Sequence, residues 1–304
     1  MENIHVSPGD KLSEVLKYAS ENTRIVLEKG VYREKLEICV SDVEIVGAGK
    51  DATVIIYDDY AKKTDEKGKE YNTFRTYTAA VLADNVTLKD LTVENDARSP
   101  EIKGQEVALT VCGDNFKAVN CGFVSTQDTV FCGPLPPDLI ERYEGFLKDE
   151  LRRGGAMRQV FENCFIAGTV DFIFGCGDAL FDQCEIKSIH DERGHGYAAA
   201  PAHSLSQETG FVFNKCRFTH GDGVKDKSIY LARPWRDYGK ASFIGCEYGS
   251  HIAPEGFDKW NDTERDKTAR FSEYGTDPLT RAGRVKWSAS LSEEDKDSLL
   301  KSFT

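Results

Sequence analysis

Gly168-Thr169-Val170-Asp171-Phe172-Ile173-Phe174-Gly175 is an apolar run with one carboxylate near its middle and a glycine at each end. Its β-branched and aromatic side chains favour burial, which is typical of a strand bounded by turns. An unpaired charge in such a strand is costly, so Asp171 must be paired, protonated or used in chemistry. The run alone leaves two interpretations open: a structural aspartate bonded to the backbone at a turn, or a functional carboxylate.

The segments around this run have the pattern of short strands. Aliphatic and β-branched residues separated by polar or glycine turns occur at 24–27, 37–40, 43–46, 53–56, 81–83, 86–88, 91–93 and 108–111. A four-residue pattern then recurs five times: a turn or polar residue, a cysteine, any residue and an apolar residue. Successive copies are 43, 20, 32 and 30 residues apart, and their cysteines are Cys121, Cys164, Cys184, Cys216 and Cys246. Such repeats predict a parallel β-helix, in which each cysteine and the apolar residue two positions later face the interior.

Three segments have a helical pattern instead. Apolar spacing predicts a helix over residues 10–20, and Ser292 with the acidic residues after it predicts a helix over 293–301. We expect these two helices to cover the ends of the solenoid. Residues 133–156 interrupt the coils and carry apolar residues on one helical face, so they are interpreted as a surface insertion or as a lid that narrows a cleft and selects shorter chains. We expect residues 1–304 to form a single domain.

Charge and hydropathy disfavour several classes of partner. The formal net charge of −12 argues against nucleic acid and favours a neutral substrate over a polyanion, unless a local basic groove overrides it. No apolar run approaches the roughly 18 residues of a membrane span, so no membrane partner is predicted. Residues 1–10 show no signal-peptide pattern, which predicts a cytoplasmic protein; a secreted or periplasmic location would require that an export signal has been removed.

The cysteines and histidines show no pattern of a metal site. The nine cysteines are an odd number without a C-x-x-C pair, which favours free thiols in a reducing compartment. The sequence also lacks a G-x-S-x-G elbow and a G-x-G-x-x-G loop after a strand. We therefore predict neither a metal nor a cofactor.

Two further stretches supply groups that could react together with Asp171. Gln127 and Asp128 follow a strand-like segment, and Arg233 lies with Trp235 in a later one. Two carboxylates, an amide and an arginine suffice for acyl transfer without serine or histidine. One carboxylate attacks, the other handles the proton, the amide binds the oxyanion and the arginine keeps the nucleophile ionised.

The blocks G-T-V-D-F-I-F-G, Q-D-T and R-P-W, in this order, resemble the signature blocks of the pectinesterases, or pectin methylesterases. Further similar blocks occur at 30–34, 104–109, 271–275 and 284–287, so the resemblance extends from about residue 5 to 290. It implies a right-handed parallel β-helix with the active site in a cleft on the outer face. Ala200-Pro201 is similar to the bacterial members.

The resemblance also implies a role for each candidate residue. Asp171 would attack the C6 carbonyl of a methylated galacturonate, and Arg233 would hold it ionised and aim it. Asp128 would donate a proton to the leaving methanol and then act as base toward water. Gln105 and Gln127 would bind the oxyanion.

Aromatic side chains near these residues are suited to bind a sugar ring. We expect substrate contacts from Trp235, Phe172, Phe131 and Tyr77, with core packing as the alternative for each. The predicted function is methanol release, by a monomer, from methyl-esterified homogalacturonan or its oligomers. A chain-cleaving polygalacturonase or pectate lyase and a non-catalytic oligosaccharide-binding β-helix remain as alternatives.

Overall fold

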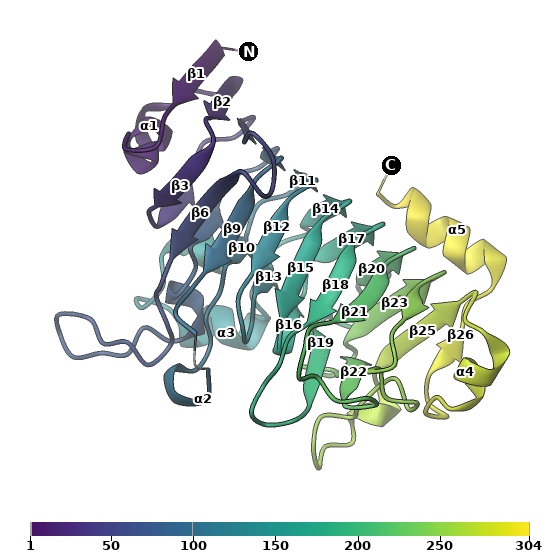
Figure 1. The fold of residues 1–304 in the computed structure, drawn as a ribbon. Helices are drawn as coiled ribbons and strands as arrows, with labels where there is room; N and C mark the ends of the chain where they lie inside the picture. Colours follow the sequence, from purple (N-terminus) through teal and green to yellow (C-terminus); the bar gives the residue numbers. More distant parts are fainter. Residues whose placement is uncertain (1, 99, 304) are drawn as a thin grey trace.

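The chain winds into a parallel β-helix, as predicted (Figure 1). The computed structural model describes residues 2–98 and 100–303. In this part of the chain, the strands form three parallel sheets of 11, 7 and 8 strands, and neighbouring strands in a sheet come from successive coils. Each coil adds one rung to each sheet, so residues about one coil apart in sequence lie side by side.

The strand boundaries follow this threefold division. The 11-stranded sheet contains β1 (Glu2–Val6), β2 (Thr23–Leu27), β5 (Glu44–Val46), β8 (Thr87–Lys89), β11 (Phe116–Val119), β14 (Arg158–Glu162), β17 (Asp178–Asp182), β20 (Phe211–Asn214), β23 (Lys240–Ile244), β25 (Arg270–Tyr274) and β26 (Ala289–Ser290). The 7-stranded sheet contains β4 (Leu36–Ile38), β7 (Ala79–Val81), β10 (Leu109–Val111), β13 (Val130–Cys132), β16 (Val170–Gly175), β19 (Gly196–Pro201) and β22 (Ile229–Ala232). The 8-stranded sheet contains β3 (Gly30–Arg33), β6 (Thr53–Tyr57), β9 (Thr92–Asn95), β12 (Gly122–Val124), β15 (Phe165–Gly168), β18 (Glu185–Ser188), β21 (Arg217–His220) and β24 (Glu247–Tyr248).

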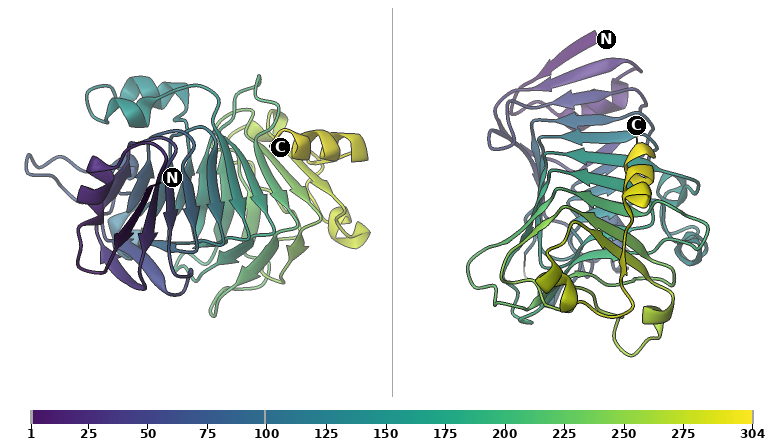
Figure 2. Two further views of the ribbon diagram at one scale, coloured as in Figure 1. Left: turned by 90° about the horizontal axis from the view of Figure 1, so that it is seen from above. Right: turned by 90° about the vertical axis from the view of Figure 1, so that its right-hand side faces the viewer.

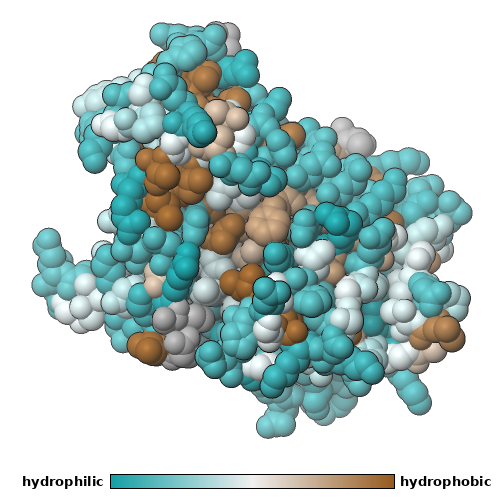
Figure 3. All heavy atoms as spheres, in the orientation of Figure 1, coloured by the Kyte–Doolittle hydropathy of each residue, from teal (hydrophilic) through white to brown (hydrophobic). Residues whose placement is uncertain are grey.

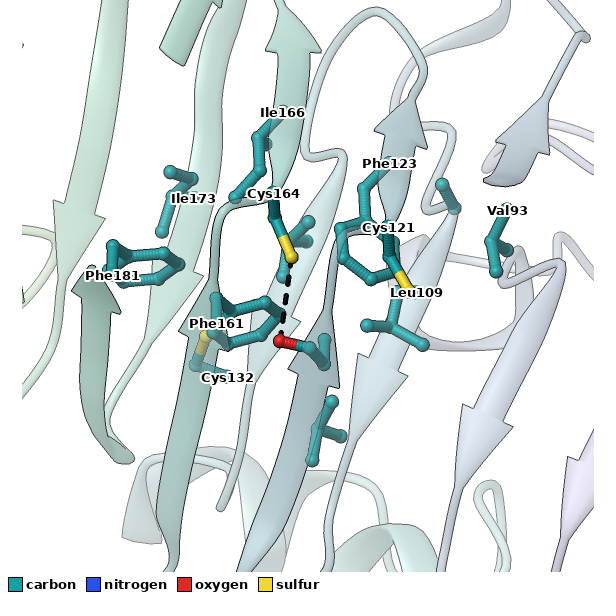
Figure 4. Packing of buried hydrophobic residues seen from close by; sticks show 14 of the residues in the cluster. Val93, Leu109, Cys121, Phe123, Cys132, Phe161, Cys164, Ile166, Ile173 and Phe181 are labelled. Atoms are coloured by element: carbon teal, nitrogen blue, oxygen red, sulfur yellow. Dashed lines mark hydrogen bonds between the residues drawn. The ribbon is translucent and has the colours of Figure 1, made fainter. Parts of the chain in front are cut away.

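The recurring cysteine units mark equivalent corners of successive coils. All five cysteines precede strands of the 8-stranded sheet, and the apolar residue two positions later also points into the core. The residue before each cysteine has a positive φ of 51–57°, at Asn120, Asn163, Gln183, Lys215 and Gly245. Asparagine and glycine adopt this conformation most readily, which explains the turn-like residue in the repeat. Figure 4 shows Cys121 and Cys164 in the core, where the Cys164 thiol donates to the Ala118 carbonyl at 3.6 Å.

Rows of stacked side chains fill the core. Phe161, Phe181, Phe213 and Phe243 come from successive strands of the 11-stranded sheet, and the ring centroids of each neighbouring pair are 4.8 Å apart. This distance equals the spacing of neighbouring strands, so the in-register pairing of the coils places one ring directly over the next.

The terminal helices lie at opposite ends of the solenoid (Figure 1). Helix α1 (Leu12–Tyr18) buries Leu12 and Leu16 in the main core beside β4. Helix α5 (Glu293–Lys301) has Ser292 as its N-cap, as the sequence predicts, and Ser292 and Asp295 form a capping box. The helix packs on the outer face of the 11-stranded sheet near the last coils. At this end, Trp287 packs against the core, with its ring centroid 5.7 Å from that of Phe271.

The segment 133–156 packs on the outer face of the 7-stranded sheet. It contains α3 (Pro137–Arg142) and the 3-10 helix η2 (Asp149–Arg152). The helical pattern predicted within residues 133–156 does not form one continuous helix, because α3 ends at Arg142 and the chain turns at Gly145, whose φ is +67°. Leu135, Leu139, Leu147 and Leu151 nevertheless form one apolar cluster with outward side chains of the sheet. Seen from above in Figure 2, α3 lies across the solenoid from the 8-stranded sheet.

The remaining helices are short and lie in the connections between strands. They are α2 (Pro100–Lys103), α4 (Pro278–Ala282), η1 (Thr73–Arg75) and η3 (Arg265–Lys267). Figure 3 shows the side of the molecule with the 8-stranded sheet, where hydrophilic residues cover most of the surface. In the described residues, no helix is long and apolar enough to cross a membrane.

Candidate active site

Two carboxylates occupy the same position in successive coils. Val130 of β13 pairs with Ile173 of β16, and the residues two positions earlier are Asp128 and Asp171. Both aspartates have a positive φ, of 65° and 53°, and the Asp128 amide donates to the Val170 carbonyl at 3.1 Å. Their coils are therefore one rung apart, about 4.8 Å. The same left-handed conformation occurs at the corner residues before the recurring cysteines, so each aspartate lies at a tight corner of its coil.

The glycines that bound the Asp171 run allow the coils to approach closely. A Cβ at Gly175, where φ is +127°, would lie 2.1 Å from the Cys132 carbonyl oxygen, and one at Gly168 would lie 2.7 Å from the Thr129 Oγ1, both in the preceding coil. Only a residue without a side chain fits at these two positions. The sequence thus folds Asp171 into a tight corner between two coils.

Arg233 binds Asp171 through two parallel hydrogen bonds. Its Nε and Nη2 atoms donate to the two carboxylate oxygens at 2.8 and 2.7 Å, and the side chains are only 13% and 10% exposed. The guanidinium carbon also lies 3.8 Å from the ring centroid of Tyr197 and 4.1 Å from that of Trp260. Two aromatic rings and a bidentate carboxylate therefore hold this cation in one orientation.

The two aspartates differ in their electrostatic surroundings. Burial and the neighbouring charge of Asp171 raise the pKa of Asp128 well above its usual value. Burial also raises the pKa of Asp171, but the hydrogen bonds and charge of Arg233 oppose this increase. Asp128 therefore holds its proton to higher pH than Asp171, which provides an acid and an anion side by side.

Arg193 determines which way the amide of Gln127 faces. Its Nη1 donates to the Gln127 Oε1 at 3.0 Å, while Asp191 holds the same guanidinium through bonds of 2.7 and 2.6 Å. A guanidinium has donors only, so it must meet the amide oxygen and leave the amide NH₂ for another acceptor. Gln127 lines the same cavity as Asp128 and Asp171, so its NH₂ is available to a ligand beside the two carboxylates. Arg193 lies in a loop without a strand pattern, so the sequence did not predict its role.

The five predicted catalytic residues meet in one cavity of about 410 Å³ on the outer side of the 7-stranded sheet. They are Gln105, Gln127, Asp128, Asp171 and Arg233, and Trp235 lines the same cavity. A pocket of this size accommodates a small ligand or part of a longer one. The structure thus brings together the acid, the anion, two amides and a flat aromatic face.

Three of the predicted substrate contacts are buried instead. Phe172 and Phe131 have no exposed surface, and Tyr77 is 4% exposed and donates its hydroxyl to Glu37. None of the three lines the cavity. The prediction for Phe172 is wrong because the register shifts between Val170 and Ile173, which turns Phe172 into the core.

Other aromatic side chains take the place of these residues at the cavity. Phe74, Phe174, Tyr143 and Trp260 line it together with Trp235. Phe174 is an outward residue of β16, and its ring centroid lies 5.8 Å from that of Trp235. Trp260 follows an irregular segment after β22, so no strand or helix periodicity in the sequence points to it.

Comparisons with known proteins give one consistent result. A family model described as Pectinesterase matches residues 7–134 and 148–304. The chain is 31% identical to pectinesterase QRT1 of Arabidopsis thaliana, over 91% of this chain and 67% of that protein. It is 30% identical to pectinesterase/pectinesterase inhibitor U1 of Solanum lycopersicum, over 91% of this chain and 45% of that protein.

Solved structures agree with these relatives. Pectin methylesterase PemA of Erwinia chrysanthemi aligns with a TM-score of 0.80 at 25% identity, covering 99% of this chain and 96% of that one. A pectin methylesterase in complex with a hexasaccharide aligns with a TM-score of 0.79 at 26% identity, covering 97% of this chain and 92% of that one. The residues between the two parts of the family match, 135–147, lie in the segment that carries α3.

Proposed function

Because the chain belongs to the pectinesterase family, we propose that Asp171 and Asp128 carry out methyl-ester hydrolysis in the cavity described above. The enzyme is a carboxylic-ester hydrolase that acts on methyl-esterified galacturonate units of pectin and releases methanol. One observation supports this mechanism above all. The Asp171 carboxylate, which Arg233 binds, lies one coil away from the buried Asp128 carboxyl, whose pKa is raised.

The first half of the reaction forms an acyl-enzyme. The Asp171 carboxylate attacks the ester carbonyl carbon, and the carbonyl oxygen becomes an oxyanion that accepts hydrogen bonds from the amides of Gln105 and Gln127. As the bond to the methoxy oxygen breaks, Asp128 donates its proton and methanol leaves. The intermediate is a mixed anhydride between Asp171 and the galacturonate carboxyl.

The second half returns the enzyme to its starting state. Asp128, now a carboxylate, takes a proton from a water molecule that attacks the galacturonate carbonyl carbon. The anhydride bond breaks, the free acid of the sugar leaves, and Asp171 is again an anion bound by Arg233. The protons and electron pairs balance within the two aspartates, water and substrate.

We expect a bell-shaped pH dependence of kcat/KM. Protonation of Asp171 removes the nucleophile as the pH falls, and deprotonation of Asp128 removes the proton donor as the pH rises. Because the pKa of Asp128 is the more strongly raised of the two, the alkaline limb belongs to Asp128. Initial rates of methanol release, corrected for chemical hydrolysis of the ester, measure both limbs.

The variant Asp128→Asn tests whether deprotonation of Asp128 causes the decline of kcat/KM at alkaline pH. It should lower the maximal rate about 10²–10⁴-fold, the usual contribution of a general acid and base, and abolish the alkaline decline. An alkaline limb that persists unchanged in this variant would show that another group donates the proton.

We further propose that the enzyme prefers short methylated oligomers to long pectin. Leu139, Arg142 and Tyr143, in or directly after α3, line one wall of the cavity. Arg236, which also lines the cavity, is bound to Asp138 of the same helix by bonds of 3.1 and 2.8 Å. This bridge narrows the cleft beside the reacting carboxylates and hinders passage of a continuous polymer.

The chain-length preference is measured by comparing kcat/KM per methyl group on methylated oligogalacturonides and on long pectin of equal methylation. Several-fold faster reaction of the oligomers is expected. Faster reaction of the polymer would rule out a length-selecting role for α3 without affecting the proposed chemistry.

A reducing compartment is proposed from the thiols. All nine cysteines are free and most are buried in the solenoid core. Proteins that keep so many unpaired thiols usually reside where disulfides do not form. Fusion of the full-length chain to a compartment-sensitive reporter in its native cell would test this proposal.

A further inference from the structure

Trp260 lies against the guanidinium that binds the proposed nucleophile. The guanidinium carbon of Arg233 is 4.1 Å from the Trp260 ring centroid, and the same guanidinium donates two hydrogen bonds to Asp171. An aromatic face attracts a cation, and the attraction is strongest where water is excluded. Since the side chain of Arg233 is only 13% exposed, its contact with Trp260 is largely shielded from water.

The loop that carries Trp260 is anchored directly beside Arg233. The amide of Asp258 donates to the carbonyl of Ala232, the residue before Arg233, at 3.1 Å. The Asp258 Oδ1 atom accepts a hydrogen bond from the Trp260 amide at 2.7 Å, and the Thr263 hydroxyl donates to the Trp260 carbonyl at 2.9 Å. Trp260 has a φ of +72°, a conformation that is unfavourable for a bulky side chain. The fold therefore keeps the indole ring on Arg233 at a cost in backbone strain.

The orientation of the Arg233 guanidinium determines that of the Asp171 carboxylate. Two parallel hydrogen bonds keep a guanidinium and a carboxylate close to one plane. These bonds do not prevent the two groups from tilting together, whereas aromatic rings in contact with the guanidinium resist this tilt. Tyr197 of β19 supplies a second ring at 3.8 Å, and it stacks on Tyr230 of β22 with ring centroids 5.5 Å apart. The aromatic contacts thus aim the Asp171 oxygen that attacks the ester.

We propose that Trp260 is a positioning residue, which acts on the reaction through Arg233 and keeps Asp171 aligned for attack. The inference rests on the proposed function and adds a residue that determines the rate at the same site. Because Trp260 also lines the cavity, the competing role is that of a flat face for a sugar, as expected of Trp235. The two roles differ in kinetics: a ring that binds the substrate uniformly changes KM, while a ring that aligns the nucleophile changes kcat.

Site-specific replacement of Trp260 by tryptophans with increasing numbers of ring fluorines tests the proposal. Fluorine withdraws electron density from the ring face and weakens its attraction for a cation, while the side chain keeps nearly the same shape. The kcat for methanol release from a methylated oligogalacturonide should fall progressively, by about threefold to thirtyfold for the fully fluorinated ring. The affinity for the oligomer, measured by titration, should stay within about twofold of the wild type.

Trp287 provides the matched control, because it packs against Phe271 at the C-terminal end and does not line the cavity. The same fluorinated residues at this position should alter neither kcat nor affinity. Trp260→Phe and Trp260→Leu give a second measurement. The phenyl ring should retain more of the wild-type kcat than the leucine side chain, since only the former presents an aromatic face to Arg233.

A kcat that does not change across the fluorinated Trp260 series would overturn the proposal. In that case, a loss of affinity would identify Trp260 as a sugar-binding face, and an unchanged affinity would leave it a role in packing alone. Absence of methanol release by the wild type would instead refute the proposed function.

Discussion

Replacement of Asp171 by asparagine is expected to reduce methanol release about 10⁴-fold or more, because the amide cannot attack the ester carbon. The substitution keeps the shape of the side chain but removes the negative charge that Arg233 binds. Binding of the oligomer should change much less than turnover. Initial rates of methanol release on a methylated oligogalacturonide measure the loss, and a binding titration with the same oligomer measures the retained affinity.

The control for this variant is Asp182→Asn. Asp182 lies on β17 in the 11-stranded sheet, away from the cavity, and accepts a hydrogen bond from Asn214 at 2.7 Å. Its substitution should leave the rate within about twofold of the wild type. The variant Asp171→Ala excludes slow deamidation of the asparagine as a source of residual activity. Activity above a few per cent in both Asp171 variants, with the fold retained, would show that another group attacks the ester.

Loss of the buried ion pair between Glu273 and Arg284 is expected to have the largest effect on stability. Two hydrogen bonds of 3.0 and 3.2 Å join these side chains, whose exposure is 0% and 1%. Arg284→Met leaves the Glu273 carboxylate buried without its cation, which should lower the free energy of unfolding by about 3–5 kcal/mol. Urea unfolding followed by circular dichroism measures this change.

The double variant Glu273→Leu/Arg284→Met is the control for the ion pair. Removal of both charges avoids an unpaired buried charge and should recover much of the stability lost in Arg284→Met. Tyr248 donates its hydroxyl to Glu273 at 2.9 Å and loses this partner, so recovery should be incomplete. If Arg284→Met lowers the free energy of unfolding by less than about 1 kcal/mol, the ion pair contributes little to stability.

The sequence predicts the coils well because the repeats report directly on the core. The predicted inward positions at the five cysteine units lie in the core, since each coil repeats one turn residue and one buried pair. The blocks around Glu273 and Arg284, which the resemblance singled out, join through the buried ion pair at the C-terminal end. Local patterns that repeat with each coil are therefore sufficient to predict the architecture from the sequence.

The lining of the cavity depends on features that no local pattern reports. Strand alternation places Phe172 and Phe174 on one face, but the register shift before Ile173 sends Phe172 inward and leaves Phe174 at the cavity. Trp260 and Arg193 reach the site from irregular loops, and their positions depend on the packing of distant coils. Hence the reacting groups were predictable from their blocks, while most of the surrounding aromatic and basic groups were not.

Chain cleavage measured together with methanol release tests the central claim most directly. Wild-type enzyme and Asp171→Ala are incubated with a highly methylated oligogalacturonide in the presence of a chelator, and methanol, new reducing ends and unsaturated uronates are measured in the same reaction. The carboxylate mechanism predicts methanol release at constant chain length by the wild type and none by the variant. Methanol release that persists in Asp171→Ala, or chain cleavage that accompanies it in the wild type, would contradict this mechanism.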